Sequence, residues 1–304
     1  EVLARTFDIG PPGLALVVLD NTHPDAVGAV LGSEDLERTL FIVASKSGTT
    51  LEANVFLATF LAALRQRVGA RAGRHFVAIT DEDTPLARRA AEEGFRYCFI
   101  NPGDVGGRYS ALTYFGMVPA ALLGLDLERL AAAADSAVSA AQKADSSALA
   151  LGLFLGHWAG NGRDKLCVLL SGALAALSVW IEQLIAESTG KRGIGIVPVE
   201  DALLSPEAYS DDLMFVAVTL SEDAELSKRC RRLEAAGYPV QCHTITTKEA
   251  LAGEFFRWEF ATAVAGVVLG INPFDEPDVT VSKQMTAALL QGTAKSTSQE
   301  WSLL

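Results

Sequence analysis

The sequence predicts an α/β fold in which two doubly wound parallel sheets form two lobes joined by helices. Two observations carry this prediction. Short apolar runs rich in Val, Ile and Phe alternate with segments whose apolar residues recur at helical spacing, and this alternation occurs twice along the 304 residues. A mostly helical stretch separates the two series. Strands joined by crossover helices form parallel sheets that are covered on both faces, so each series predicts one lobe.

The first series predicts four strands and two helices. The strands are expected over residues 14–20, 39–45, 75–81 and 95–101, which are short and rich in Val, Ile and Phe. Segments 50–70 and 83–94 carry apolar residues at positions i, i+3 and i+4, as amphipathic helices do. We expect these helices to be the crossover connections of the first sheet.

The middle of the chain predicts connecting helices. Residues 114–125, 127–144 and 148–160 are rich in Ala and Leu, and Asp145, Ser146 and Ser147 are expected to separate the last two helices. Gly152 and Gly156 lie four residues apart on one face of the third helix, which indicates close packing against another helix.

The second series predicts three strands, each followed by a helix. The strands are expected over residues 165–171, 212–221 and 239–245, and the helices over 173–188, 222–237 and 249–270. We therefore predict two domains. Residues 1–144 form the first lobe with its connecting helices, and residues 145–304 form the second lobe.

Composition excludes several classes of function. The net charge of −12 disfavours nucleic acids and anionic membranes as main partners. No apolar run reaches the length that crosses a bilayer, and the N-terminus has no signal-peptide pattern, so we expect a cytoplasmic protein. The four cysteines have no C-x-x-C spacing and are expected to be reduced, buried thiols. No spacing of His and Cys indicates a metal site.

The segment SKSGTT, residues 45–50, joins a predicted strand to a predicted helix. A helix N-terminus has unpaired amides and a partial positive charge, so hydroxyls there either cap the helix or help to hold a phosphate. One hydroxyl is enough for a cap, whereas this turn carries Ser45, Ser47, Thr49 and Thr50. The Walker A pattern is absent, so nothing here indicates phosphoryl transfer, and a bound phosphate would be left intact. From these residues alone, a phosphate site and a simple capped turn both stay open.

Four segments resemble one family. The sequence FIVASKSGTTLE is similar to the phosphate loop of sugar isomerase (SIS) domains, and more narrowly to that of phosphoglucose isomerases. Segments 103–122, 180–199 and 255–279 match the same family in the same order. The likeness is greatest to the isomerase half of bacterial transaldolase/glucose-6-phosphate isomerase fusions. It implies two SIS lobes, a homodimer, no cofactor, a transaldolase domain before residue 1, and a sequence that is shortened at both ends.

The resemblance also implies an activity and a set of site residues. The activity is the interconversion of glucose 6-phosphate and fructose 6-phosphate through an enediol intermediate. Ser45, Ser47, Thr49 and Thr50 would then hold the phosphate group. Glu187 would be the base and Arg108 the cation beside the developing oxyanion. Gln183, one helical turn before Glu187, and Gly107, beside Arg108, would contact the sugar.

Ring opening is the step that the sequence assigns least well. The family uses a histidine with a lysine nearby, supplied late in the chain or by a partner subunit. His243 is the best candidate among the four histidines, although no known motif surrounds it. Lys191 is expected either to hold the active-site loop or to lie on the surface. Two alternatives therefore stay open, namely a non-catalytic sugar-phosphate-binding module and an isomerase of another hexose phosphate.

Overall fold

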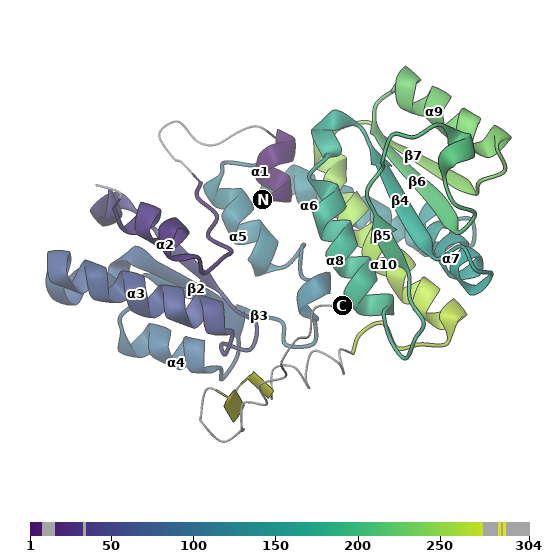
Figure 1. Cartoon of the computed structure of the whole chain (residues 1–304). Helices are drawn as coiled ribbons and strands as arrows, with labels where there is room; N and C mark the ends of the chain where they lie inside the picture. The colour runs from purple at the N-terminus through teal and green to yellow at the C-terminus, as the bar shows by residue number, and fades with distance from the viewer. Residues whose placement is uncertain (8–15, 33–34, 276–284, 287, 290–304) are drawn as a thin grey trace.

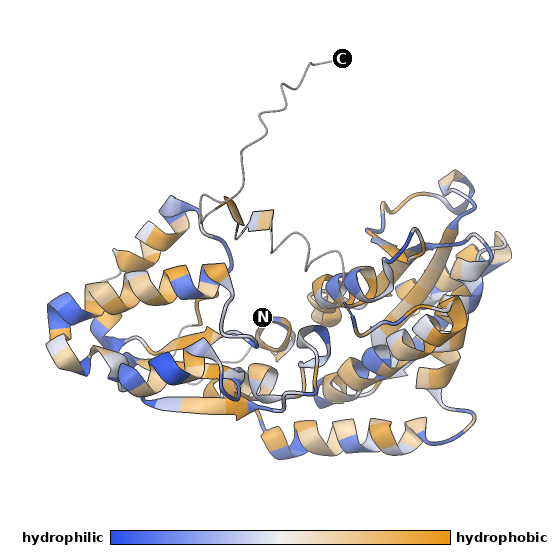
Figure 2. Ribbon diagram, turned by 90° about the horizontal axis from the view of Figure 1, so that it is seen from below, coloured by the Kyte–Doolittle hydropathy of each residue, from blue (hydrophilic) through white to orange (hydrophobic). Residues whose placement is uncertain are grey.

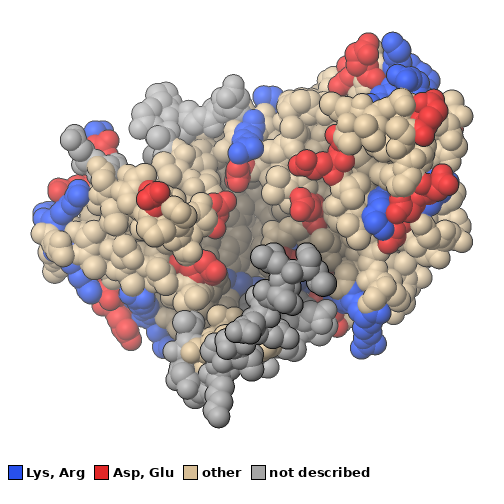
Figure 3. Space-filling view, viewed as in Figure 1, with Lys and Arg blue, Asp and Glu red and all other residues tan. Residues whose placement is uncertain are grey.

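The structure, a computed structural model, describes residues 1–7, 16–32, 35–275, 285–286 and 288–289. Two lobes lie side by side, each built on its own parallel sheet, the first within residues 41–101 and the second within residues 165–245 (Figure 1). Leu3 and Phe7 of the N-terminal helix pack in the hydrophobic core of the second lobe. Figure 3 shows a hollow in the molecular surface between the lobes. The predicted α/β fold with two parallel sheets is confirmed.

The first sheet has three parallel strands in the order β1-β2-β3. Its strands are β1 (Phe41–Ala44), β2 (Phe76–Asp81) and β3 (Tyr97–Asn101), and its crossover helices are α3 (Leu51–Val68) and α4 (Pro85–Glu92). Right-handed connections that run in one direction along a sheet place their helices on one face. Residues of α3 and α4 accordingly share one core with Phe76 and Ala78 of β2.

A strand was expected over residues 14–20, but residues 16–20, the part of this range that the structure describes, form no strand. Residues 16–20 lead from the short helix α1 (Val2–Phe7) toward α2 (Pro24–Leu31) and pair with no other strand, while residues 14 and 15 lie outside the described residues. Leu16, Val17 and Val18 are exposed. An apolar run becomes a strand only where a neighbour completes its ladder hydrogen bonds, and among the described residues β1 pairs with β2 alone.

Three helices connect the lobes, as predicted. They are α5 (Tyr114–Leu122), α6 (Leu127–Ala141) and α7 (Ser147–Gly160). Helix α7 packs against α10 (Leu251–Leu269) through two glycines. A Cβ atom on Gly152 would lie 2.5 Å from Cβ of Val264, and one on Gly156 would lie 2.6 Å from Cβ of Val268. The two helices approach so closely because neither glycine has a side chain.

The second sheet has four parallel strands in the order β5-β4-β6-β7. They are β4 (Lys165–Leu170), β5 (Val197–Val199), β6 (Leu213–Leu220) and β7 (Val240–Ile245), with helices α8 (Leu177–Thr189) and α9 (Ala224–Ala235). The chain steps outward from β4 to β5 and then returns past β4 to β6, so this sheet is doubly wound. The strand β5 was not predicted, since it has three residues and contains Pro198.

Hydropathy agrees with this arrangement. The strands of both sheets are coloured mainly as hydrophobic, and the helices that cover them alternate between apolar and polar residues (Figure 2). None of the described helices combines the length and the hydropathy that a bilayer crossing requires. Short 3-10 turns complete the described chain at Leu36–Arg38, Gly69–His75, Gly107–Tyr109 (η3), Gly172–Leu174, Pro206–Ala208 and Lys248–Ala250.

Candidate active site

The turn at residues 45–50 connects β1 to α3 at the end of the first sheet that is nearer the second lobe (Figure 1). Gly48 has a φ of +67°, and a Cβ atom there would lie 2.8 Å from the amide nitrogen of Leu86. Only glycine satisfies both constraints. The turn is therefore held tightly against the first residues of α4.

The four hydroxyls of this turn bond to one another in pairs. Oγ of Ser45 lies 2.8 Å from Oγ1 of Thr50, and Oγ of Ser47 lies 2.7 Å from Oγ1 of Thr49. Thr50 is the N-cap of α3, yet its side chain makes no capping hydrogen bond. Three of these residues, Ser47, Thr49 and Thr50, are exposed. The turn thus presents hydroxyls and the first amides of α3 to a ligand, which is the arrangement that binds phosphate.

Lys46 ties this turn to its neighbours, a role that the sequence reasoning missed. Its ammonium group pairs with the carboxylate of Asp81 at the end of β2 and donates a hydrogen bond of 2.9 Å to the carbonyl of Gly103. The lysine thereby connects the turn to the loop that leads to Arg108. Its place inside SKSGTT was the only available signal.

Arg108 and Glu187 lie in contact, although 79 residues separate them. Arg108 lies in η3, which packs against the C-terminal end of α8, where Glu187 is located. Nη1 of Arg108 lies 3.4 Å from Oε2 of Glu187, and Nε2 of Gln183 donates to Oε1 of Glu187 at 3.2 Å. The guanidinium is buried, with 8% of its side chain exposed, whereas 37% of the Glu187 side chain is exposed. The carboxylate is therefore oriented by the protein and still accessible to a ligand.

Other donors of Arg108 are also engaged. Nε donates to Oγ of Ser188 at 3.0 Å, and Nη2 donates to the carbonyls of Pro273 and Asp275 at 3.3 and 3.1 Å. Gly107 lies next to it, and a Cβ atom on Gly107 would meet nothing within 4 Å. The space that a side chain at Gly107 would occupy is therefore open.

Lys191 is buried rather than on the surface. Its ammonium group donates to the carbonyls of Ser188 and Asn272 at 3.0 and 2.5 Å and pairs with the carboxylate of Asp275 at 2.9 Å. Residues 272–275 follow α10, so Arg108 and Lys191 both hold the same short segment. Ser188 and residues 272–275 were missed as site residues, even though both lie within segments that carry the resemblance.

Tyr109 also belongs to this cluster and contacts the segment at residues 272–275. Its hydroxyl donates to the carbonyl of Pro273 at 3.2 Å, and its ring packs against Phe274. Burial raises the pKa of Tyr109, while a hydrogen bond with Ser188 and the charge of Arg108 act in the opposite direction. The phenol therefore stays neutral and acts as a donor.

His243 lies apart from this cluster. It is on β7, and its Nε2 lies 3.0 Å from Oε1 of Glu254, a buried carboxylate on α10. The other three histidines have local roles as well. His23 caps α2, His75 bonds to the carbonyl of Thr39, and His157 packs edge-on against Trp158. None of the contacts among the described residues brings a histidine to Glu187.

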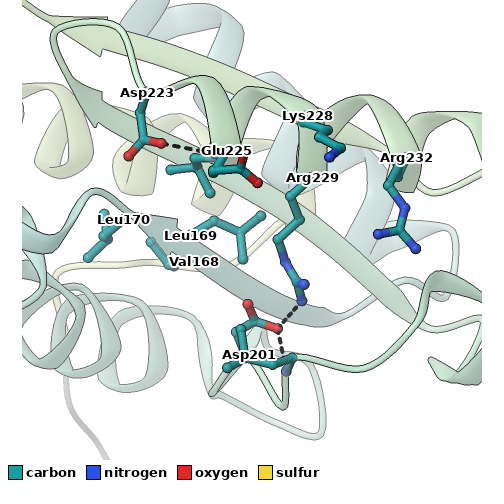
Figure 4. A pocket seen from close by; sticks show the side chains of 11 residues that line it. Val168, Leu169, Leu170, Asp201, Asp223, Glu225, Lys228, Arg229 and Arg232 are labelled. Carbon is teal, nitrogen blue, oxygen red and sulfur yellow. Dashed lines mark hydrogen bonds and ion pairs between the residues drawn. The ribbon is translucent and has the colours of Figure 1, made fainter.

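A cavity of about 530 Å³ lies elsewhere in the second lobe, between β4 and α9 (Figure 4). Three of the charged side chains that line it, Asp201, Asp223 and Arg229, have partners within the lobe. Nη2 of Arg229 lies 2.5 Å from Oδ1 of Asp201, and Asp223 caps α9 through the amide of Leu226. No three His, Cys, Asp or Glu side chains gather as a metal site in the part of the chain that the structure describes. The Arg108–Glu187 cluster remains the stronger candidate because its carboxylate is both oriented and exposed.

Comparisons with known proteins identify the family of the chain. The family model described as phosphoglucose isomerase matches residues 5–199. Glucose-6-phosphate isomerase of Rubrobacter xylanophilus is 28% identical over 326 residues, which cover 92% of this chain and 75% of the relative. Glucose-6-phosphate isomerase of Thermus thermophilus is 29% identical over 329 residues, covering 92% of this chain and 78% of the relative.

Solved structures show the same fold. A hypothetical protein of Thermus thermophilus matches with a TM-score of 0.85 and 25% identity, over 95% of this chain and 81% of that one. A glucose-6-phosphate isomerase from Chlamydia trachomatis matches with a TM-score of 0.79 and 20% identity, over 97% of this chain and 68% of that one. The family model covers more than half of the chain, and we conclude that this protein belongs to the phosphoglucose isomerase family.

Proposed function

We propose that this protein is an aldose–ketose isomerase that interconverts glucose 6-phosphate and fructose 6-phosphate, a reaction of glycolysis and gluconeogenesis. The observation that carries the proposal is the contact between Arg108 and Glu187, in which a buried cation orients an accessible carboxylate. The names of the relatives support the choice of substrate. The reaction needs a phosphate anchor, a base and a cation near the developing oxyanion, and each has a candidate here.

The proposed steps follow from the chemistry of these groups. The turn at 45–50 binds the phosphate through its hydroxyls and the first amides of α3, and Gln183 and the open space at Gly107 accommodate the sugar. Glu187 removes the proton from C2 of the open-chain aldose, which leaves an enediolate with negative charge on the C1 oxygen. A proton then passes from the C2 hydroxyl to the C1 oxygen through the enediol, and Glu187 returns its proton to C1, which gives the ketose. Arg108 stabilises the negative charge that develops on the oxygens of C1 and C2. No residue of the described cluster is assigned to ring opening.

The first test is turnover of glucose 6-phosphate by the wild type and by Glu187→Gln, without added metal. The amide cannot accept the proton, so we expect kcat to fall by about 10²- to 10⁴-fold. Glu182→Gln is the matched control, because Glu182 is exposed on the same helix, and it should keep wild-type turnover. Equal activity of Glu187→Gln and the control would exclude Glu187 as the base.

One observation favours a second candidate function. Each of the four histidines has another partner, and among the described residues none contacts Glu187. A protein that binds a sugar phosphate without converting it needs no histidine for ring opening. Such a module would show a higher melting temperature with glucose 6-phosphate and no turnover. An isomerase of another hexose phosphate would turn over a different member of a substrate panel faster.

Three further parts of the proposal concern the protein as a whole. We propose that it is a cytoplasmic homodimer, in which a partner subunit is one possible source of the ring-opening group. Light scattering coupled to size-exclusion chromatography would measure the dimer mass. A transaldolase domain before residue 1 stays a prediction, which the gene sequence upstream would test directly.

A further inference from the structure

Two cysteines lie on the same side of the second sheet, one on a strand and one on a helix that covers it. Cys242 is on β7, and in the parallel pairing of β6 with β7 its partner is Ala217. Side chains of paired residues in adjacent strands point to the same face of a sheet. Cys230 is on α9 and packs in one hydrophobic cluster with Ala217. The register of the sheet therefore directs Cys242 toward the face that α9 covers.

The next position on β7 supports this direction independently. His243 pairs in register with Val218, which belongs to the core that includes residues of α10, and Nε2 of His243 lies 3.0 Å from Oε1 of Glu254 on α10. Successive side chains of a strand alternate between the two faces of the sheet. Cys242 therefore points away from α10 and toward α9.

The two thiol groups are close enough to share a hydrogen bond. This bond lowers the pKa of Cys242 to about 7, whereas the same bond and burial raise the pKa of Cys230 above its ordinary value. Cys242 is exposed and Cys230 is buried. A reagent in solution can thus reach the thiol that ionises first, and the second thiol lies directly behind it.

We propose that Cys242 and Cys230 are a site of reversible oxidation, at which a low-molecular-weight disulfide converts the two thiols into a disulfide between β7 and α9. In the first step the Cys242 thiolate attacks one sulfur of the reagent, which forms a mixed disulfide and releases one thiolate. In the second step the sulfur of Cys230 attacks the sulfur of Cys242. The second thiolate of the reagent leaves and takes up the proton of Cys230. The two cysteines are oxidised by two electrons, and the reagent is reduced to two thiols.

The other two cysteines do not meet the same conditions. Cys167 on β4 packs in the same cluster as Cys230, but it is fully buried, and burial raises its pKa to about 12. Cys98 lies on β3 in the first lobe. Because the thiolate is the form that attacks a disulfide, Cys242 is the cysteine that we expect to react first.

The disulfide would fasten an edge of the second lobe. It closes the loop from residue 230 to residue 242, which contains the last turn of α9 and its connection to the edge strand β7. An excess of a small thiol reverses both steps. The pair does not belong to the Arg108–Glu187 cluster, so the proposal does not depend on the proposed isomerase activity.

The test treats the full chain with glutathione disulfide at neutral pH, stops the reaction with acid and maps the cysteines by mass spectrometry. We expect the intact protein to lose the mass of two hydrogen atoms, and the number of free thiols to fall from four to two. Digestion should give a linked pair of peptides that contain residues 230 and 242, and dithiothreitol should separate them. Three outcomes would overturn the proposal: a stable glutathione adduct at Cys242, a link from Cys230 to Cys167, or four thiols that stay free.

Cys230→Ala separates the two steps. This variant keeps the accessible thiol and lacks the second one, so we expect it to stop at the mixed disulfide and to retain one glutathione at Cys242. Cys98→Ala is the matched control and should form the same link as wild type. Loss of the link in Cys98→Ala would contradict the assignment of the pair. If Cys230→Ala does not fold, the peptide map of the wild type decides the question by itself.

Discussion

The buried carboxyl group of Glu259, on α10, predicts a specific dependence of stability on pH. One of its carboxylate oxygens, Oε1, is buried and has no hydrogen-bond partner in the described part of the chain. Burial raises the pKa of this carboxyl from its ordinary value of 4.5 to about 8. At neutral pH the folded protein therefore holds a proton that the unfolded chain releases.

The sign of the pH effect follows from this difference in bound protons. Between pH 4.5 and 8 the folded state binds more protons at Glu259 than the unfolded state does, so raising the pH through this window lowers the free energy of unfolding. The slope approaches about 1.4 kcal/mol per pH unit for a single group, which amounts to about 2.5 kcal/mol between pH 5.5 and 7.5. This loss should be complete above pH 8 and absent below pH 4.5.

Glu259→Gln removes the titrating group and keeps the shape of the side chain. We expect the stability of the variant relative to wild type to increase by about 2.5 kcal/mol between pH 5.5 and 7.5. Urea unfolding at a series of pH values measures this difference, because the other titrating groups are common to both proteins and cancel. Glu182→Gln, on an exposed glutamate, should run parallel to wild type. Parallel curves for Glu259→Gln as well would refute a proton bound at Glu259.

Three other substitutions or measurements test separate features. Arg108→Lys keeps the charge but cannot reach all the acceptors of the guanidinium at once, so we expect kcat for glucose 6-phosphate to fall about a hundredfold. The melting temperature should fall as well, because the lost hydrogen bonds also hold residues 272–275. Gly152→Ala places a methyl group 2.5 Å from Val264 and should lower the free energy of unfolding by about 1–3 kcal/mol in urea; an unchanged midpoint would mean that α7 and α10 separate easily. Cys242 is exposed, and a hydrogen bond from Cys230 lowers its pKa to about 7, so mass spectrometry should find it alkylated at pH 7 before the other three cysteines.

The sequence predicted the regular part of the fold well. Six of the strands that the structure describes begin and end within two residues of their expected positions. The central strands β2, β4 and β6 are buried and apolar, and the others are short runs rich in β-branched and aromatic residues. Residues 16–20 satisfied the same criterion and form no strand. Composition reports the tendency to be buried, whereas a strand also needs a hydrogen-bonding neighbour, which no local pattern specifies.

Long-range contacts explain what the sequence reasoning missed at the candidate site. Glu187 and Gln183 share a helical face, so their contact follows from spacing alone. Lys46 bonds to Asp81 and to Gly103, which come from a different strand and a different loop. Cys242 was expected to be buried, and that expectation was wrong because it lies on an edge strand of the second sheet.

The acceptors that residues 272–275 offer to Arg108 are main-chain carbonyls at Pro273 and Asp275. Main-chain atoms are the same in every amino acid, so these two bonds place no demand on the side chains that flank them. The position of this segment instead restricts the residue type at Gly266, where a Cβ atom would lie 2.8 Å from the ring of Pro273. Natural variation should therefore tolerate no larger residue at 266, whereas position 274 should keep an aromatic side chain because the ring of Phe274 packs against Tyr109. A survey of related sequences would find its most restricted position one helical turn before the end of α10, at a residue that touches no substrate.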